Sequence, residues 1–252
     1  MFFMVNYFIK SLFDYIISIL LVIIFSPIII ITSFFIWNQD YSNPFYIASR
    51  VGKNEKLFKM IKFRSMVIDA DKNNVDSTSS NDNRITKIGS IIRKYKIDEI
   101  PNLFNIIKGE MSFVGPRPNV KRETDLYTDQ EKSLLTIKPG ITDLSSIVFS
   151  DEGDILKDSE DPDIDYNQLI RPWKSRLGIF YVDNNSILLD IKILYLTIIS
   201  LYNKSFALRK IEFLLLKKNN LIDKKLLKVV KRKSPLIPYP PPGMEKIIKS
   251  RL

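Results

Sequence analysis

The sequence predicts an α+β protein that has one membrane-inserted helix, a mainly helical domain with a short β-hairpin, and amphipathic helices on its surface. Residues 15–39 contain no charged side chain, residues 43–66 alternate aromatic and cationic residues around a turn signal, and most other apolar residues recur at helical spacing. A chain of 252 residues has room for one sizeable domain with attachments. We expect a membrane helix over 1–40, a central domain over 41–203 and a basic amphipathic tail over 204–252.

The first element is the apolar segment Tyr15–Gln39, which is long enough to cross a bilayer, since a crossing helix needs about 20 apolar residues. Ser26 and Pro27 lie at its middle, where proline removes a helix hydrogen bond. A kink there can return the helix to the side it came from, with the serine satisfying freed backbone groups. Hydropathy alone leaves a spanning helix and a re-entrant helix open. Basic residues follow the segment and predict a cytoplasmic domain: Arg50, Lys53, Lys56, Lys59, Lys62 and Arg64.

After the hairpin expected over 43–66, which turns at "VGKNEK", the polar stretch 71–84 is predicted to be a loop. Ile85, Ile88 and Ile92 then recur at helical spacing and predict a helix.

Pro101 suits the first turn of a further helix, which Gly109 closes. The adjacent carboxylates Asp98 and Glu99 therefore lie near a break between two short helices, where side chains can enter a cleft.

The C-terminal third contains four further segments. Residues 151–165 hold eight acids and one lysine and are predicted to be a solvated loop rather than a metal site, because EF-hand spacing is absent. An apolar helix is expected from about Ser186, and "PLIPYPPPG" (235–243) is interpreted as a rigid polyproline spacer. In the tail, spaced apolar residues with lysines between them fit a helix on the membrane surface or a helix packed on the domain: Leu208, Ile211, Leu215, Ile222, Leu226 and Val229.

Composition restricts the chemistry that is open to this chain. It contains no cysteine and no histidine, which excludes disulfides, thiolate nucleophiles and the commonest general base. Any metal should be a hard, oxygen-bound ion. The net charge of +10 belongs to the tail: residues 201–252 hold 14 bases and 3 acids, while the other 200 residues hold 24 bases and 25 acids. Such a tail suits nucleic acid or an anionic membrane.

The stretch "RKYKIDEIPNLFNIIKGEMSFVGPRP" (93–118) combines these features into a candidate site. Neighbouring helix positions face different ways, so Asp98 and Glu99 can take different roles. Nearby cations should keep both carboxylates ionised, and an ionised aspartate can attack phosphorus while its neighbour holds Mg²⁺. Phosphate groups would bind to the guanidinium groups of Arg64, Arg93 and Arg117, the last of which stands between two prolines.

The order of the motifs is more specific than the dyad. An apolar segment with a central Ser-Pro, then "RVG", "KFRSM", "RITKIGSIIRKYKIDEIPNLFNIIKGEMSFVGPRP" and "KPGIT", resembles the bacterial sugar transferase family over about residues 7–200. These proteins are monotopic phosphoglycosyl transferases (polyprenyl-phosphate hexose-1-phosphate transferases), which begin glycan assembly on a polyprenyl phosphate carrier. The chain is most similar to the small, minimal class.

This resemblance implies a reaction and residue roles. Asp98 would attack the β-phosphate of a UDP-sugar, releasing UMP and leaving a covalent phosphosugar that polyprenyl phosphate then accepts. Glu99 would help hold Mg²⁺, Arg93 would contact the carrier phosphate and Arg117 the nucleotide-sugar. Lys62 and Arg64 match the basic residues of the "KFR" motif. The product would be the first membrane-bound intermediate in the biosynthesis of a polysaccharide, an O-antigen or a glycoprotein.

The resemblance also implies a re-entrant helix broken at Ser26-Pro27, in the bacterial inner membrane, with the active site on the cytoplasmic face. Three places depart from the family pattern: Lys10-Ser11 replaces Lys-Arg, Asn102 replaces glutamine, and Asp143, Ser145 and Ser146 alter the segment after "KPGIT".

Two other functions stay open on the sequence. The chain could be a membrane-tethered binding protein that acts through its basic tail, or a hydrolase that uses the dyad as acid and base, which the basic surroundings disfavour. The transferase interpretation expects a UDP-sugar, polyprenyl phosphate and the membrane as partners, and no nucleic acid. The identity of the sugar and the oligomeric state, a homo-oligomer included, do not follow from the sequence.

Overall fold

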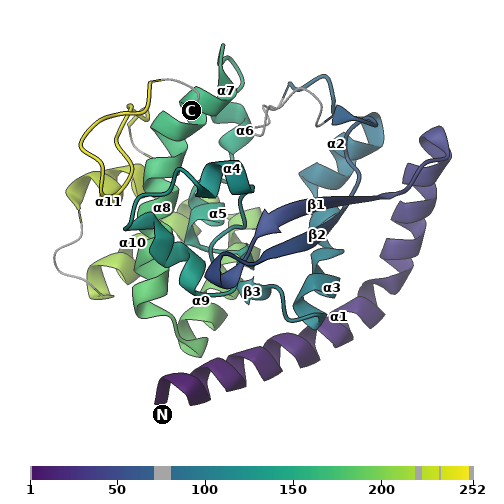
Figure 1. Cartoon of the computed structure of the whole chain (residues 1–252), viewed down its shortest axis with the longest axis horizontal. Helices are drawn as coiled ribbons and strands as arrows, with labels where there is room; N and C mark the ends of the chain where they lie inside the picture. The colour runs from purple at the N-terminus through teal and green to yellow at the C-terminus, as the bar shows by residue number, and fades with distance from the viewer. Residues whose placement is uncertain (1, 71–80, 219–222, 233, 250–252) are drawn as a thin grey trace.

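The computed structural model describes residues 2–70, 81–218, 223–232 and 234–249 and has the predicted α+β architecture (Figure 1). A long helix, α1 (Phe2–Asp40), runs beside a mainly helical domain that carries two small two-stranded sheets. Strands β1 (Phe45–Val51) and β2 (Leu57–Phe63) form the expected antiparallel hairpin. The parallel pair β3 (Ser112–Val114) and β4 (Gly140–Thr142) was not predicted, because strands this short leave little periodicity in a sequence.

After α1, the described helices are short as far as residue 170, and α8, α9 and α10 beyond it are longer. The expected helices around the dyad and from Ser186 are confirmed, and most of the predicted loop over 71–84 lies outside the described residues. The helices are α2 (Lys87–Lys94), α3 (Asn102–Ile107), α4 (Lys121–Thr124), α5 (Leu144–Val148), α6 (Glu152–Ile155), α7 (Pro162–Asp165), α8 (Arg171–Asn184), α9 (Ile187–Tyr202), α10 (Lys204–Lys218) and α11 (Lys224–Lys231).

Helix α1 continues through Pro27, so the helix is not broken at Ser26-Pro27 as expected. Figure 1 shows α1 as one helix that bends along the domain. Pro27 has no N–H to donate to the carbonyl of Ile23, and the Ser26 hydroxyl donates to that oxygen instead, at 2.8 Å. The predicted role of the serine is thus confirmed. Within the described residues α1 is the one helix long and apolar enough to cross a membrane, and only 11% of its most apolar stretch is buried in the protein.

Both ends of α1 are bound to the same domain. Near its start, Lys10 Nζ lies 2.5 Å from the Asp190 carboxylate of α9 and 3.1 Å from the carbonyl oxygen of Val114. At its end, Asp40 accepts two hydrogen bonds from the guanidinium of Arg64, at 2.5 and 2.6 Å. Between these points, α1 packs against α3. The domain therefore contacts the membrane helix along its length.

The hydrophobic core has two parts. The larger part is built around α8 and α9 and includes Trp173, Leu177 and Tyr181, each almost completely buried. A smaller cluster joins Ile36 of α1, Phe63 of β2 and Ile92 of α2. This second cluster fixes the end of the membrane helix to the two elements that flank the dyad.

The C-terminal segment is packed on the larger core instead of forming a separate tail, so the expected boundary at 203/204 has no counterpart in the packing. Four of the predicted apolar positions, Leu208, Ile211, Leu215 and Leu226, are buried there, which supports the domain-packing alternative for α10 and α11; Ile222 lies outside the described residues.

The polyproline stretch is not a free spacer either. The ring of Tyr239 stacks on Trp173 at 4.5 Å between centroids, and the Pro242 carbonyl accepts a hydrogen bond from Thr128. The stretch lies on the domain surface because its aromatic ring and its carbonyls find partners there.

The acidic stretch 151–165 is only partly a loop, because it contains α6 and α7. Asp161 caps α7, accepting from the backbone of Asp163 and Ile164. Asp151 and Glu152, at the start of α6, form ion pairs with basic side chains from other elements. These acids therefore hold elements together instead of remaining solvated.

A buried ion pair joins α8 to the chain before β4. The guanidinium of Arg171 donates to both carboxylate oxygens of Glu131, at 2.8 and 3.1 Å, and Ser175 donates to the same carboxylate at 2.6 Å. Glu131 is fully buried and Arg171 is 3% exposed.

We expect Glu131→Gln to destabilise the protein by about 3–5 kcal/mol, because it leaves the Arg171 charge buried without its partner. Thermal unfolding of detergent-solubilised protein would measure this as a lower midpoint. Asp129→Asn, which removes the exposed pair with Lys132, is the control and should leave the midpoint in place. Equal midpoints for Glu131→Gln and the wild type would contradict the prediction.

Candidate active site

The dyad lies on a tight turn between two helices, as predicted. Helix α2 is capped by the Thr86 hydroxyl, which accepts from the backbone of Gly89, and it ends at Lys94. Lys96 then adopts the left-handed conformation (φ 58°) and turns the chain into the 3₁₀ turn η3 (Ile97–Glu99), which holds both carboxylates. Pro101 leads into α3 directly afterwards. The reversal at Lys96 is what separates the dyad from α2.

Buried polar contacts of Asn105 hold α3 against β2. Its side chain accepts from the backbone N–H of Ile61 at 2.9 Å and donates to the carbonyl of Lys59 at 2.7 Å. It also donates to Glu110 at 2.7 Å. Because these bonds fix the register of α3 on β2, they bring Lys62 to the side of the dyad.

One carboxylate oxygen of Glu99 accepts from two cations. Lys62 Nζ lies 2.9 Å and Arg117 Nη2 lies 2.5 Å from Glu99 Oε1. These three residues come from β2, from η3 and from the loop after β3. Lys62, Glu99 and Arg117 therefore lie together, as predicted. In this structure the two cations bind the Glu99 carboxylate, whereas they were expected to bind the substrate.

Two glycines allow the loop that carries Arg117 to lie where it does. A Cβ atom on Gly115 would approach the Lys138 carbonyl oxygen to 2.3 Å, and one on Gly140 would approach the Gly115 nitrogen to 2.1 Å. Strands β3 and β4 can meet at this point only because both positions lack a side chain. The glycines of "GPRP" and "KPGIT" thus serve one contact.

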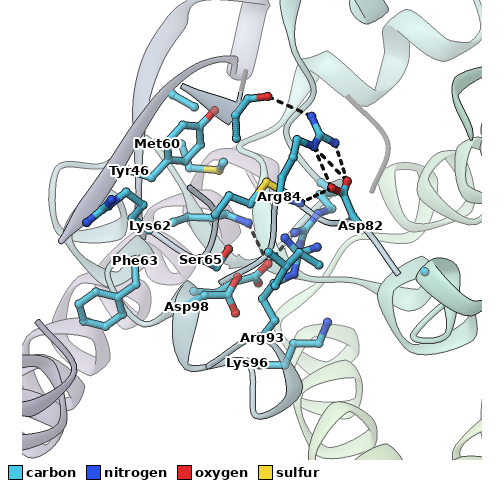
Figure 2. Close-up of a pocket in the computed structure, with 18 of the residues that line it drawn as sticks. Tyr46, Met60, Lys62, Phe63, Ser65, Asp82, Arg84, Arg93, Lys96 and Asp98 are labelled. Carbon is cyan, nitrogen blue, oxygen red and sulfur yellow. Dashed lines mark hydrogen bonds and ion pairs between the residues drawn. The ribbon is translucent and has the colours of Figure 1, made fainter. Parts of the chain in front are cut away.

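Asp98 differs from its neighbour. Its Oδ1 atom is buried and has no hydrogen-bond partner among the described residues. A buried carboxylate oxygen without a partner is uncommon in folded proteins and is typical of a group kept for a ligand or for chemistry. Lys62, Arg93 and Asp98 lie on the wall of the same cavity (Figure 2).

Burial and charge move the two carboxyl groups in opposite directions. Burial, together with the charge of Glu99, raises the pKa of Asp98, against the lowering effect of Lys62 and Arg93. Burial alone would also raise the pKa of Glu99, but Arg117 and Lys62 outweigh it and hold that pKa well below its usual range. The sequence predicted that nearby cations would keep both carboxyl groups ionised. The cations lower the pKa of Glu99 in this way, whereas the pKa of Asp98 is raised. Asp98 has the more basic and the freer oxygen.

The cavity has a volume of about 1720 Å³, which exceeds the roughly 300–1000 Å³ of common ligand sites. Its wall contains every predicted site residue of the domain, including Arg93 and Arg64. A cavity of this size has room for two substrate head groups at once.

Arg64 departs from the expectation of a phosphate ligand. All three nitrogens of its guanidinium donate within the protein, two to Asp40 and Nε to the carbonyl of Asn43 at 3.0 Å. Its observed role is to attach the end of α1 to the hairpin. This pair could not be predicted from the sequence, because Asp40 lies 24 positions earlier and its partner is set by packing.

Several residues of the cavity wall were missed. They include Asp82, Arg84, Glu152, Tyr166 and Lys174. Among the altered family positions, Ser146 lines the cavity, whereas the Asp143 carboxylate is used to cap α5. Apart from Arg84, which begins the motif "RITKIG", these residues lie outside the quoted motifs, and three-dimensional packing brings them to the cavity.

The residues present fit a hard divalent cation that also binds a substrate. Among the described residues no three acidic side chains gather into a complete metal cage. Mg²⁺, however, commonly takes only one or two carboxylates and completes its shell with phosphate oxygens and water. The orphaned Asp98 oxygen and the adjacent Glu99 carboxylate supply that kind of donor set.

The fold and the site together define a membrane-associated protein with an acidic dyad in a basic cavity. The family model of bacterial sugar transferases matches residues 5–204, and the chain belongs to this family. The exopolysaccharide production protein ExoY of Sinorhizobium fredii is 34% identical over 204 residues, which cover 75% of this chain and 83% of that protein.

Other relatives are longer. An undecaprenyl-phosphate galactose phosphotransferase from Salmonella typhimurium is 35% identical over 208 residues, covering 75% of this chain and 40% of that protein. An uncharacterized sugar transferase from Haemophilus influenzae is 34% identical over 213 residues, covering 79% of this chain and 42% of that protein. The chain thus spans less than half the length of these two relatives.

We expect Glu99→Gln to lower the melting temperature at pH 7 by the equivalent of about 3 kcal/mol, because two cations lose a shared buried partner. Since the pKa of folded Glu99 lies below its unfolded value, its ionised form stabilises the fold above pH 4.5 or so, and this contribution disappears as the pH falls through the folded pKa. Thermal scans should therefore show a constant difference from wild type between pH 7 and about pH 5, and a difference that shrinks below about pH 4.5. A difference independent of pH would contradict this, and Asp125→Asn, in an exposed pair, is the control.

Proposed function

We propose that this protein transfers a sugar-1-phosphate from a UDP-sugar to polyprenyl phosphate, with release of UMP. The observation that carries the proposal is the unpartnered, buried Asp98 oxygen on the cavity wall, next to a carboxylate that two cations already hold. Family membership and the undecaprenyl-phosphate phosphotransferase among the relatives support the same reaction class.

In the first step, an Asp98 oxygen attacks the β-phosphorus of the UDP-sugar. The bond from that phosphorus to the bridging oxygen breaks, UMP leaves with the electron pair, and the sugar phosphate is attached to Asp98 as an acyl phosphate. Asp98 is the better nucleophile of the pair because its pKa is raised and its oxygen is unpartnered, whereas Glu99 is neutralised by Lys62 and Arg117.

In the second step, a phosphate oxygen of the polyprenyl phosphate attacks the same phosphorus. The acyl phosphate bond breaks, Asp98 regains its carboxylate, and the product is a polyprenyl diphosphate-linked sugar. The cavity can hold both phosphate-bearing substrates, and Arg93 and Lys96 on its wall add positive charge beside Asp98.

Asp98 and Glu99 would hold Mg²⁺ together with the diphosphate of the donor. When bound, the ion would neutralise charge on the phosphate oxygens during displacement. Glu99 also keeps Lys62 and Arg117 at the dyad, so these cations reach the same phosphates.

We expect Asp98→Asn to reduce UMP release by at least about 10³-fold, because the amide cannot form the acyl phosphate. The assay supplies a panel of UDP-hexoses and UDP-N-acetylhexosamines, Mg²⁺, polyprenyl phosphate and lipid-solubilised protein. EDTA should also stop release. Without the carrier, donor labelled in the sugar should leave label on the wild-type protein but not on Asp98→Asn.

Two outcomes would contradict the proposal. Full UMP release by a folded Asp98→Asn protein would remove Asp98 as the nucleophile. Folded wild type that releases no UMP from any donor of the panel would contradict the transfer itself. Lys228→Met, an exposed change on α11, is the matched control and should keep wild-type release.

We further propose that α1 is re-entrant in the bacterial inner membrane and keeps the active site on the cytoplasmic face. The ion pairs of Lys10 and Asp40 tie both ends of α1 to one domain. A helix that crossed the bilayer would carry one of these ends to the other side. Its bend and the exposed apolar surface of its middle fit a helix that enters and leaves one leaflet.

Because the chain contains no cysteine, single cysteines can report this topology. We expect Asn6→Cys and Lys56→Cys both to resist a membrane-impermeant maleimide in intact spheroplasts and both to react after lysis. Labelling of Asn6→Cys before lysis, with Lys56→Cys still protected, would show a spanning helix.

A further inference from the structure

The segment after residue 204 lies outside the stretch that the family matches, yet it reaches the wall of the active-site cavity. Helix α10 packs on α5 and α9, and α11 packs on α8 and α10. Lys231 at the end of α11 pairs with Glu212 of α10 at 2.6 Å, which joins the two helices. The end of α11 is therefore held in a fixed place.

The residue at that end, Arg232, contacts the wall directly. It caps α11 in the left-handed conformation (φ 53°) and donates to the Asp151 carboxylate at 2.6 Å. Its guanidinium also lies 5.6 Å from the centre of the Phe149 ring. Lys204, at the start of α10, lies 3.2 Å from the same Asp151 carboxylate. Arg232 of the segment and Lys204, the last residue of the family match, thus bind the junction between α5 and α6, which lines the cavity.

Asp151 directly precedes Glu152, the first residue of α6. Glu152 lines the cavity and forms an ion pair with Lys174 of α8, which lies over the ring of Tyr166. After the dominant effect of Glu99, the charge of Glu152 also contributes to the raised pKa of Arg117, so Glu152 lies near enough to act on that cation. The α5–α6 junction is therefore a part of the cavity wall whose charge acts on Arg117.

The chemistry of this wall suits hydroxyl groups better than phosphates. Asp151, Glu152 and Asp154 on it are carboxylates, the first two paired with cations, and carboxylates accept hydrogen bonds from hydroxyls but offer no hydrogen-bond donor to a phosphate. In Figure 1, α6 lies at the top of the view, away from most of α1, which runs along the bottom and the right. If the lipid carrier of the proposed function arrives from the side of α1, this wall is left for the water-soluble donor.

We propose that Arg232 is a positioning residue that, by holding Asp151, sets the α5–α6 wall against the hydroxyl-bearing part of the sugar nucleotide. This inference rests on the proposed function for the identity of the donor. The positioning itself is independent of turnover. A segment outside the family match would thereby adjust donor binding without touching the dyad.

Hydrogen exchange measures the positioning without any substrate. We expect Arg232→Met to increase amide exchange in residues 144–155 severalfold, while exchange in α11 and in residues 87–107 stays at the wild-type rate. Arg232→Lys should restore most of the protection because it keeps a cation near Asp151. Lys228→Met, one turn earlier on α11, should change neither region. Unchanged exchange over 144–155, or an equal increase in α11, would overturn the inference.

Steady-state kinetics measure the consequence for the donor. With the UDP-sugar that the wild type uses, Arg232→Met should raise the donor KM about tenfold, the size of one lost charge-assisted hydrogen bond, with kcat and the KM for polyprenyl phosphate unchanged. Inhibition by UMP separates the two hydroxyl-bearing groups. A weaker UMP inhibition constant assigns the wall to the ribose, and an unchanged constant assigns it to the sugar.

The failures of the two proposals are distinguishable. If the wild type releases no UMP, the proposed function is wrong. Amide hydrogen exchange in residues 144–155 still tests the positioning role of Arg232 in that case. A wild type that turns over, with an Arg232→Met variant of unchanged donor KM, fails the inference and leaves the proposed function intact.

Discussion

The Glu99 carboxylate, shared between Lys62 and Arg117, is the interaction on which the site depends. It joins three segments that are distant in the sequence, and it places the largely buried Lys62 and the exposed Arg117 beside Asp98 with both charges compensated. The supporting contacts serve this arrangement. Asn105 fixes the strand that carries Lys62, and the contact between Gly115 and Gly140 fixes the loop that carries Arg117. Because Glu99 is committed to this role, Asp98 is left as the carboxylate of the dyad with an unpartnered buried oxygen.

Helix α1 packs directly on the elements that carry the site. The cluster of Ile36, Phe63 and Ile92 packs the end of α1 on β2 and α2, the two elements beside the dyad. Arg64 adds a bidentate ion pair to Asp40 at the same place. A phosphate group at the membrane surface would thus meet a cavity whose walls are attached to the helix that enters the lipid. This explains why a residue of the "KFR" motif is used for structure although it lies on the cavity wall.

The C-terminal helices show how far a periodic pattern can be interpreted. Apolar residues at helical spacing with lysines between them describe an amphipathic helix, but they do not say whether lipid or protein covers the apolar face. Leu208, Ile211 and Leu215 are buried against the core, so protein covers it here. Part of the positive charge is also used internally, since Lys204 and Arg232 bind Asp151. The positive charge of the C-terminal segment, which suggested a separate binding tail, is therefore explained in part by ion pairs within the protein.

The sequence by itself determined the elements that rest on local signals. The hairpin follows from its turn, the break at the dyad follows from Pro101 and the short isoleucine period, and the serine bond to Ile23 follows from Pro27. Only the tertiary structure decided how the charges pair. The different pKa shifts of Asp98 and Glu99, the use of Arg64 by Asp40 and the place of Glu152 and Arg232 at the cavity depend on burial and on long-range packing. A charge has no fixed partner in a sequence, because its partner and its desolvation are set by whatever the fold brings within a few ångströms.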